Sequence, residues 1–189
     1  MSLEHLPASL NQLTPGRWSV DPAHTKVGFV ARHMMVTKVR GSFTDYSADI
    51  IVADDPLQST INVEVQMASV NTGDDTRDGH LRTNDFFDIE NHPTMTLRST
   101  GFERKGDDFV MHTELTIKGI TKPVDFDLEF GGVAQDPWGG TRAGFEASAV
   151  VNRKDWGIEW NAPLEAGGLL VGDKVTLELD VELVKDAPA

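Results

Sequence analysis

Histidine is the side chain in this sequence that most readily suggests catalysis or metal binding. His24, His33, His80, His92 and His112 are spread along the chain, and none has the spacing of a metal-ligand pair, such as two histidines around Glu-x-x. The absence of cysteine excludes disulfides, thiolate metal sites and cysteine nucleophiles. Neither a nucleophile elbow, a phosphate-binding loop nor a dinucleotide fingerprint is present. We therefore expect no catalytic residue, no metal and no cofactor other than a bound ligand.

The densest cluster of polar side chains consists of Arg77, Asp78, His80 and Arg82. One interpretation is structural: ion pairs and caps would fix a helix to the rest of the fold. The other is functional: the cluster would form the polar mouth of a ligand site. The sequence alone leaves both interpretations open. Arg153, Asp155 and Trp156 carry the same ambiguity, and there a structural role is favoured.

The length and the charge of the chain limit its fold and the kinds of partner that it can have. The chain has 189 residues and a formal net charge of −13, and its length suits one domain with a sizeable core. Its acidity argues against nucleic acid and anionic membrane surfaces as partners. No apolar stretch is long enough to span a bilayer, so stable membrane insertion is not expected. Met1 to Leu13 does not have the pattern of a secretory signal, and the expected location is cytoplasmic.

The chain divides into a leader over residues 1–15, a main domain over 16–185 and a short tail over 186–189. In the leader, Leu3, Leu6, Leu10 and Leu13 have helical spacing, although Pro7 restricts a helix to the part that follows it. A loosely ordered leader is the favoured interpretation. The alternative is an amphipathic arm that covers one end of the domain or contacts a partner.

From Trp18 onward the hydrophobic period is two. Apolar residues alternate with polar ones over 48–52, 61–67, 109–117, 124–130, 145–151 and 175–183. Such alternation is typical of antiparallel sheets with one dry and one wet face. Acidic residues occupy the wet positions of two runs and are expected to be solvated: Asp125, Asp127, Glu129, Glu178, Asp180 and Glu182.

Two segments interrupt this pattern. His33 to Val36 could form a single helical turn after a strand. Asp74 to Asn84 is the best helix candidate in the main domain, with Thr72 or Asp74 as its cap. Many strands with short links predict an all-β barrel or sandwich of about eight strands with one or two short helices.

Periodicity does not distinguish a packed sandwich from a hollow barrel. The inward set is rich in methionine and phenylalanine, and flexible methionine side chains suit a wall that adapts to a chain-like ligand. The same residues would equally serve as ordinary core.

Several ordered motifs bear on these alternatives. They occupy 18–29 (WSVDPAHTKVGF), 32–43 (RHMMVTKVRGSF), 77–87 (RDGHLRTNDFF), 92–96 (HPTMT), 115–124 (LTIKGITKPV), 152–157 (NRKDWG) and 171–173 (VGD). They occur in order along nearly the whole chain, and they resemble the YceI-like family.

The resemblance implies an antiparallel, lipocalin-like barrel that holds a long-chain amphipathic lipid of the isoprenoid quinone or polyprenyl type. The residues expected to line its cavity are Phe29, Met34, Met35, Phe43, Val63, Met67, Leu81, Phe86, Phe87, Met95, Leu97, Phe109, Met111, Phe126, Leu128, Phe145, Ala147 and Trp156. At the mouth, Arg32 or Arg82 would pair with a phosphate, and His33 or His80 would hydrogen-bond a quinone oxygen.

Two other classes of function remain open at this point. The first is an enzyme that acts on a small apolar substrate in the same cavity, with His80, Asp78 or Asp85 as acid and base. The second is a non-catalytic interaction module, in which a homodimer forms through the leucine arm or an exposed sheet edge.

Overall fold

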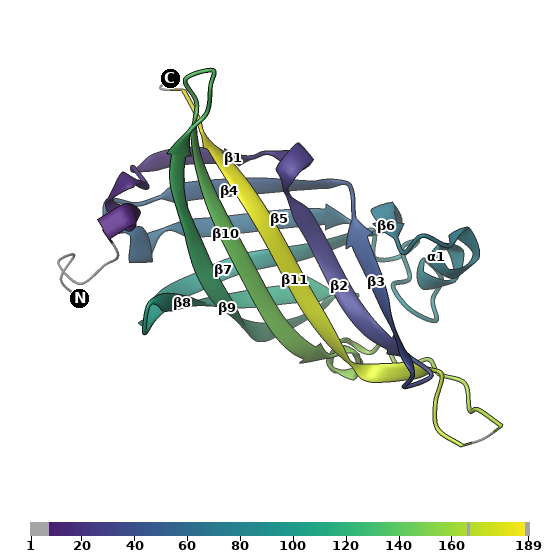
Figure 1. The fold of residues 1–189 in the computed structure, drawn as a ribbon. Helices are drawn as coiled ribbons and strands as arrows, with labels where there is room; N and C mark the ends of the chain where they lie inside the picture. Colours follow the sequence, from purple (N-terminus) through teal and green to yellow (C-terminus); the bar gives the residue numbers. More distant parts are fainter. Residues whose placement is uncertain (1–7, 166, 188–189) are drawn as a thin grey trace.

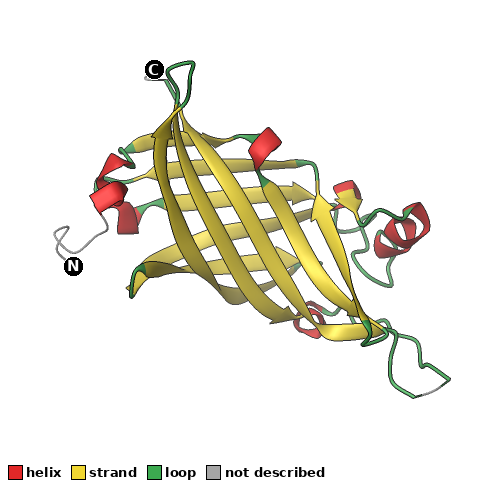
Figure 2. Ribbon diagram, viewed as in Figure 1, coloured by secondary structure: helices red, strands yellow, loops and turns green. Residues whose placement is uncertain are grey.

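The computed structural model describes residues 8–165 and 167–187. Within these residues the chain forms a closed antiparallel barrel (Figures 1 and 2). Eight strands make the ring, in this order: β1 (Gly16–Val20), β4 (Tyr46–Val52), β5 (Thr60–Gln66), β7 (Thr94–Lys105), β8 (Asp108–Ile117), β9 (Ile120–Gln135), β10 (Thr141–Asn152) and β11 (Val171–Lys185). The predicted lipocalin-like all-β architecture is thus confirmed.

The ring closes where the first strand meets the last. β1 pairs antiparallel with β11 through Trp18 opposite Lys185 and Val20 opposite Leu183. The sheet continues from β11 into β2 (Lys26–His33), β3 (Thr37–Phe43) and the two-residue β6 (Val70–Asn71). β1 and β2 are therefore successive parts of one chain segment that both lie along β11.

A short 3-10 helix, η3 (Pro22–His24), separates β1 from β2. Asp21 caps it, since its carboxylate accepts a hydrogen bond from the backbone N–H of Ala23 at 3.0 Å. Proline at the first position supplies a backbone angle suited to a helical turn. The Asp-Pro-Ala-His sequence thus breaks the strand, and the break places Asp21 and His24 beside β11.

Apolar and polar side chains alternate along the strands, and this alternation produces the dry interior as expected. Along β8 the buried residues fall on every second position, and they include Phe109, Met111 and Leu115. The outer positions carry polar side chains, apart from Val110. Thr113 also lies on the inner register, and its buried hydroxyl donates to the carbonyl of Val124 at 2.7 Å. This bond satisfies a polar group that would otherwise be costly inside the barrel.

The helical segments lie mainly at the ends of the barrel. They are η2 (Ala8–Gln12), η4 (Pro56–Gln58), η5 (Met67–Ser69), α1 (Asp75–Leu81) and η6 (Arg153–Trp156). Figure 1 shows η2 at the end nearest the N-terminus, and α1 at the opposite end, beyond β6. α1 begins after Asp74, whose carboxylate accepts from the N–H of Arg77 at 2.9 Å, so Asp74 is the predicted cap. Among the described residues, no helix is long and apolar enough to cross a membrane.

The residues from Ala8 onward do not behave as a loose leader. Leu10 and Leu13 are buried, at 4% and 7% exposure, and pack with the barrel core. This favours the alternative of an arm that covers one barrel end. Leu3 and Leu6, the other members of the leucine pattern, lie outside the described residues.

The segment from His33 to Val36 is a hairpin turn between β2 and β3, and the expected helical turn is wrong. The N–H of Val36 donates to the carbonyl of His33 at 3.1 Å, which closes the turn. Met34 and Met35 have φ angles of 55° and 60°. These left-handed conformations are incompatible with a right-handed helical turn.

We predict that Leu13→Ala lowers the free energy of unfolding by roughly 2 kcal/mol, because it leaves a void between the arm and the barrel. Denaturant unfolding would measure the loss. Gln12→Ala is the matched control, since Gln12 is exposed on the same arm, and its change should stay within about 0.5 kcal/mol. Equal stability of Leu13→Ala and the parent chain would show that the arm does not contribute to the fold.

Candidate functional site: an apolar cavity inside the barrel

The barrel encloses a cavity of about 300 Å³. This volume lies at the lower end of the range usual for ligand sites. Side chains from all eight ring strands line it, together with residues of η2, η4, α1 and η6. The cavity therefore extends from the end covered by Leu10 and Leu13 to the end where Leu81 and Trp156 lie.

The structure places most of the predicted lining residues at this cavity. They are Phe29, Phe43, Val63, Met67, Leu81, Phe86, Phe87, Met95, Leu97, Phe109, Met111, Phe126, Leu128, Phe145, Ala147 and Trp156. Met34 and Met35 are the exceptions, and their assignment to the wall is wrong. Both are exposed at the tip of the β2–β3 hairpin, beyond the last inward position of the strand.

Close packing of aromatic rings shapes the wall near α1. Phe29 lies 5.7 Å from Phe43, and Phe43 lies 6.0 Å from Phe87, between ring centroids. The Phe29 ring lies directly over Gly41 on the neighbouring strand, where an added Cβ would come within 2.3 Å of the ring. Gly41 is therefore needed for Phe29 to occupy its position in the wall.

Among the described residues, four of the lining side chains are polar: Thr25, Tyr46, Ser59 and Arg153. The Thr25 hydroxyl accepts from the N–H of Glu182 at 3.1 Å, and the Ser59 hydroxyl accepts from the N–H of Ala53 at 3.1 Å. Both hydroxyls thus already serve the barrel backbone. Burial raises the pKa of Tyr46, which keeps its phenol protonated at neutral pH.

Arg153 is a buried cation at the cavity wall, and its hydrogen bonds are structural. Its guanidinium donates to the carbonyls of Gly172 at 2.9 Å, Ile158 at 2.7 Å and Trp160 at 3.0 Å. Asp173 lies 3.7 Å away as its counter-ion. Burial lowers the pKa of Arg153, but an arginine remains charged at neutral pH. The structural interpretation of this residue thus fits the geometry, because the guanidinium fixes the segment after η6.

The four residues expected to bind a head group do not line the cavity. Arg82 donates to the carbonyls of Ala68 at 3.0 Å and Val70 at 3.3 Å, so it fastens α1 to the neighbouring strand segment. Arg32 lies on the exposed outer register of β2, and His33 ends that strand opposite Val171. A shared polar mouth built from these side chains is therefore not what the structure shows.

His80 lies outside the cavity wall as well. Its Nε2 is 2.8 Å from a carboxylate oxygen of Asp85. The ring contacts Phe86 and Trp160 edge-on, at centroid distances of 5.0 and 4.6 Å. His80 thereby joins α1 to the segment that follows η6.

Asp78 and Arg77 also hold the local fold together. The buried Asp78 carboxylate accepts from the N–H and the hydroxyl of Thr72, at 2.9 and 2.6 Å. Arg77 Nε donates to the same hydroxyl at 2.7 Å. Asp78, His80 and Asp85, the candidate acid and base residues of the enzyme alternative, are thus all outside the cavity wall.

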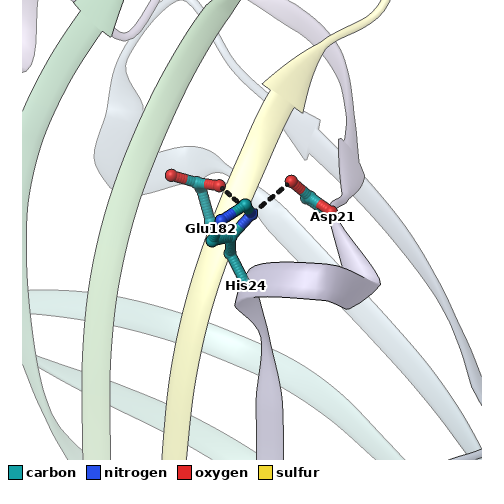
Figure 3. A group of neighbouring side chains, drawn as sticks. All are labelled: Asp21, His24 and Glu182. Atoms are coloured by element: carbon teal, nitrogen blue, oxygen red, sulfur yellow. Dashed lines mark hydrogen bonds and ion pairs between the residues drawn. The ribbon is translucent and has the colours of Figure 1, made fainter.

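A second polar cluster, which the sequence did not reveal, lies on the outside of the barrel (Figure 3). His24 Nδ1 is 2.9 Å from Asp21 Oδ2 and 3.1 Å from Glu182 Oε2. Glu182 is therefore more than a solvated face residue. Arg142 Nη1 donates to the same two carboxylates, at 2.5 and 3.0 Å. A divalent cation at these oxygens would have to displace the guanidinium, so the geometry is that of an ion-pair network.

This network shifts the titration of its members. Hydrogen bonds from His24, from Arg142 and from the Ala23 N–H lower the pKa of Asp21 far below its ordinary value. The hydrogen bond to Asp21, aided by the Glu182 carboxylate, raises the pKa of His24. A second histidine, His112, has its pKa raised by its hydrogen bond to Asp125. His24 and His112 thus hold their protons more tightly in the folded chain than in the unfolded one.

Because both pKa values are raised on folding, the stability that they contribute is fully present below about pH 6.5. It is lost as the pH rises through the folded-state pKa values. We predict that the melting temperature of the parent chain decreases as the pH rises through these pKa values. His24→Gln and His112→Gln should each make this decrease smaller. Thermal unfolding from pH 5.5 to 8.5 would measure it, with the double variant as control. A His24→Gln curve that runs parallel to the parent curve would contradict the assigned network.

Taken together, the fold and cavity define a hollow, lipocalin-like antiparallel barrel with an apolar interior. The profile of the YceI-like domain matches residues 18–183. A UPF0312 protein of Staphylococcus aureus is 36% identical over 169 residues, which cover 87% of this chain and 95% of that protein. The chain therefore belongs to the YceI-like family.

Solved structures agree with this assignment. The YCEI protein of Campylobacter jejuni matches with a TM-score of 0.70 and 30% identity, over 82% of this chain and 90% of that one. A domain of Saccharophagus degradans described as polyisoprenoid-binding matches with a TM-score of 0.65 over 90% of this chain and 98% of that one. At 16% identity, the second likeness shows the shared fold alone.

Proposed function

We propose that the chain binds a long-chain amphipathic lipid, of the isoprenoid quinone or polyprenyl type, with its tail in the barrel cavity. The observation that carries this proposal is the nearly continuous apolar wall, which runs from η2 to α1 and η6. The domain of similar fold from Saccharophagus degradans is described as polyisoprenoid-binding, which supports the same class of ligand.

The physical basis is transfer of the tail out of water. Each methylene group that is buried contributes about 0.8 kcal/mol, so a long tail gains affinity without any specific polar contact. Flexible methionines in the wall, including Met67, Met95 and Met111, allow the cavity to adapt to the tail. Binding, transport or storage of the lipid follows from this chemistry more directly than catalysis does, since the candidate acid and base residues lie outside the wall.

The binding experiment is mass spectrometry of the gently purified protein, native and then after solvent extraction. We expect a stoichiometric lipid that is lost on extraction. Ala147→Trp should lower the bound fraction severalfold, because Ala147 is buried against the cavity and an indole would fill it. Ser148→Trp is the matched control, since the adjacent side chain is exposed, and it should leave binding unchanged. A chain that carries no lipid and takes up no quinone, polyprenyl phosphate or fatty amide would overturn the proposal.

Tyr46 is our candidate for the polar contact with the head group. It is the single tyrosine of the sequence and lines the cavity at the start of β4. Its phenol can donate a hydrogen bond to a quinone or phosphate oxygen. Unlike those of Thr25 and Ser59, its hydroxyl makes no hydrogen bond to the described residues that would compete with this role.

We predict that Tyr46→Phe weakens the binding of an isoprenoid quinone by about tenfold, since one hydrogen bond is lost. Binding of a hydrocarbon of similar length, which lacks a polar head, should stay the same. Competition with a fluorescent lipid would measure both affinities. Equal losses for the two ligands would mean that Tyr46 acts through packing of the wall and not through its hydroxyl.

A further inference from the structure

The tip of the β2–β3 hairpin exposes a group of apolar side chains. Met34, Met35 and Val36 are 43%, 66% and 75% exposed, and Leu169 of the neighbouring segment is 46% exposed. The two segments are joined, because the N–H of Met34 donates to the carbonyl of Leu170 at 2.8 Å. Exposed apolar groups that cluster in this way mark surfaces that contact a partner or a membrane.

The backbone of the tip is strained at two of the residues that carry these side chains. Met34 and Met35 both have positive φ angles, which glycine and asparagine adopt far more readily than methionine. Neither side chain gains burial in return, since both are exposed. Strain that no packing compensates suggests that these residues serve a function.

The charges of the hairpin are opposite to those of the chain as a whole. The chain has 17 basic and 30 acidic residues, yet the segment 26–43 contains no acidic residue. Its basic residues are Lys26, Arg32, Lys38 and Arg40, of which Arg40 pairs with Glu178 of β11 at 3.4 Å. Arg32 and Lys38 stand directly opposite each other in the pairing of β2 with β3, and both are exposed. Like charges in this position are unfavourable unless an anionic surface neutralises them.

From these three features, we propose that the hairpin tip docks on the surface of an anionic lipid bilayer. Met34, Met35 and Val36 would enter the interface, and Arg32 and Lys38 would meet the anionic head groups. The overall acidity of the chain argues against general attraction to such a surface, and it therefore confines the contact to this locally basic tip and orients the barrel upon it.

The position of the tip fits the delivery of a ligand, and this part of the inference rests on the proposed function. Ala31 and Val171 line the cavity, and the tip starts three residues after Ala31. His33, which precedes the turn, pairs with Val171. A lipid tail that enters or leaves at this end would therefore pass close to the docked surface.

The test is sedimentation of the 189-residue chain with vesicles of phosphatidylcholine alone or with phosphatidylglycerol added. We expect binding to the anionic vesicles that weakens with salt. Met34→Asn/Met35→Gly should reduce it by about tenfold or more and should raise the melting temperature, because the new residues relieve the turn. Arg32→Gln/Lys38→Gln should remove the preference for anionic vesicles. Val150→Asn, an exposed position on the barrel wall, should change nothing.

Failure of this inference and failure of lipid binding in the cavity give different results. Met34 and Met35 do not line the cavity, so the tip variant should take up a quinone from detergent solution as the parent chain does. No binding of the parent chain to anionic vesicles at low salt would overturn docking, whatever the cavity holds. A change in oligomeric mass in the tip variant, with vesicle binding intact, would assign the tip to contact with a second copy and would also overturn it.

Discussion

Closure of the sheet by pairing of β1 with β11 is the constraint on which the rest of the structure depends. Only three residue pairs make this seam, from Trp18 opposite Lys185 to Val20 opposite Leu183. Without it the ring would be an open sheet, and its inner face would be exposed to water. Trp18, at 1% exposure, anchors the seam from inside, and its indole N–H donates to the carbonyl of Thr14 at 2.9 Å. Closure also removes most of the free strand edges that would invite pairing with other chains.

The break at η3 follows from the same closure. β11 has fifteen residues, and it pairs with β1 at one end and with β2 along the rest. Between the two, the chain turns through η3, and the ion-pair network of Asp21, His24, Glu182 and Arg142 ties this turn to β11 and β10. Most of these side chains are partly exposed, so each pair contributes little by itself. Their shared geometry nevertheless fixes the position of the turn on the barrel wall.

The sequence predicts the strands and most of the wall because alternation is a local property. Once Phe109 and Met111 are known to face inward, Leu115 and Ile117 follow by counting. Counting fails where the strand ends: β2 ends at His33, and Met34 and Met35, although apolar, lie in the turn and are exposed. Glu182 lies on the outer register, as the alternation predicts, but it is not simply solvated. Its partners His24 and Arg142 are distant in sequence, and only the closed ring brings them together.

Arg82 illustrates a further limit. An arginine near a histidine and an aspartate fits a head-group site as well as a capping network, and the choice depends on which acceptors lie within reach. Arg82 donates to the backbone carbonyls of Ala68 and Val70. Because every residue has a backbone carbonyl, the sequence does not reveal which of them accept a hydrogen bond. The same holds for Arg153, whose partners are the carbonyls of Ile158, Trp160 and Gly172. The arginines that hold the barrel end together thus have their donors committed to the backbone. In the proposed function, recognition of a head group is therefore left to groups such as the Tyr46 phenol, and most of the affinity for a long ligand comes from the apolar wall.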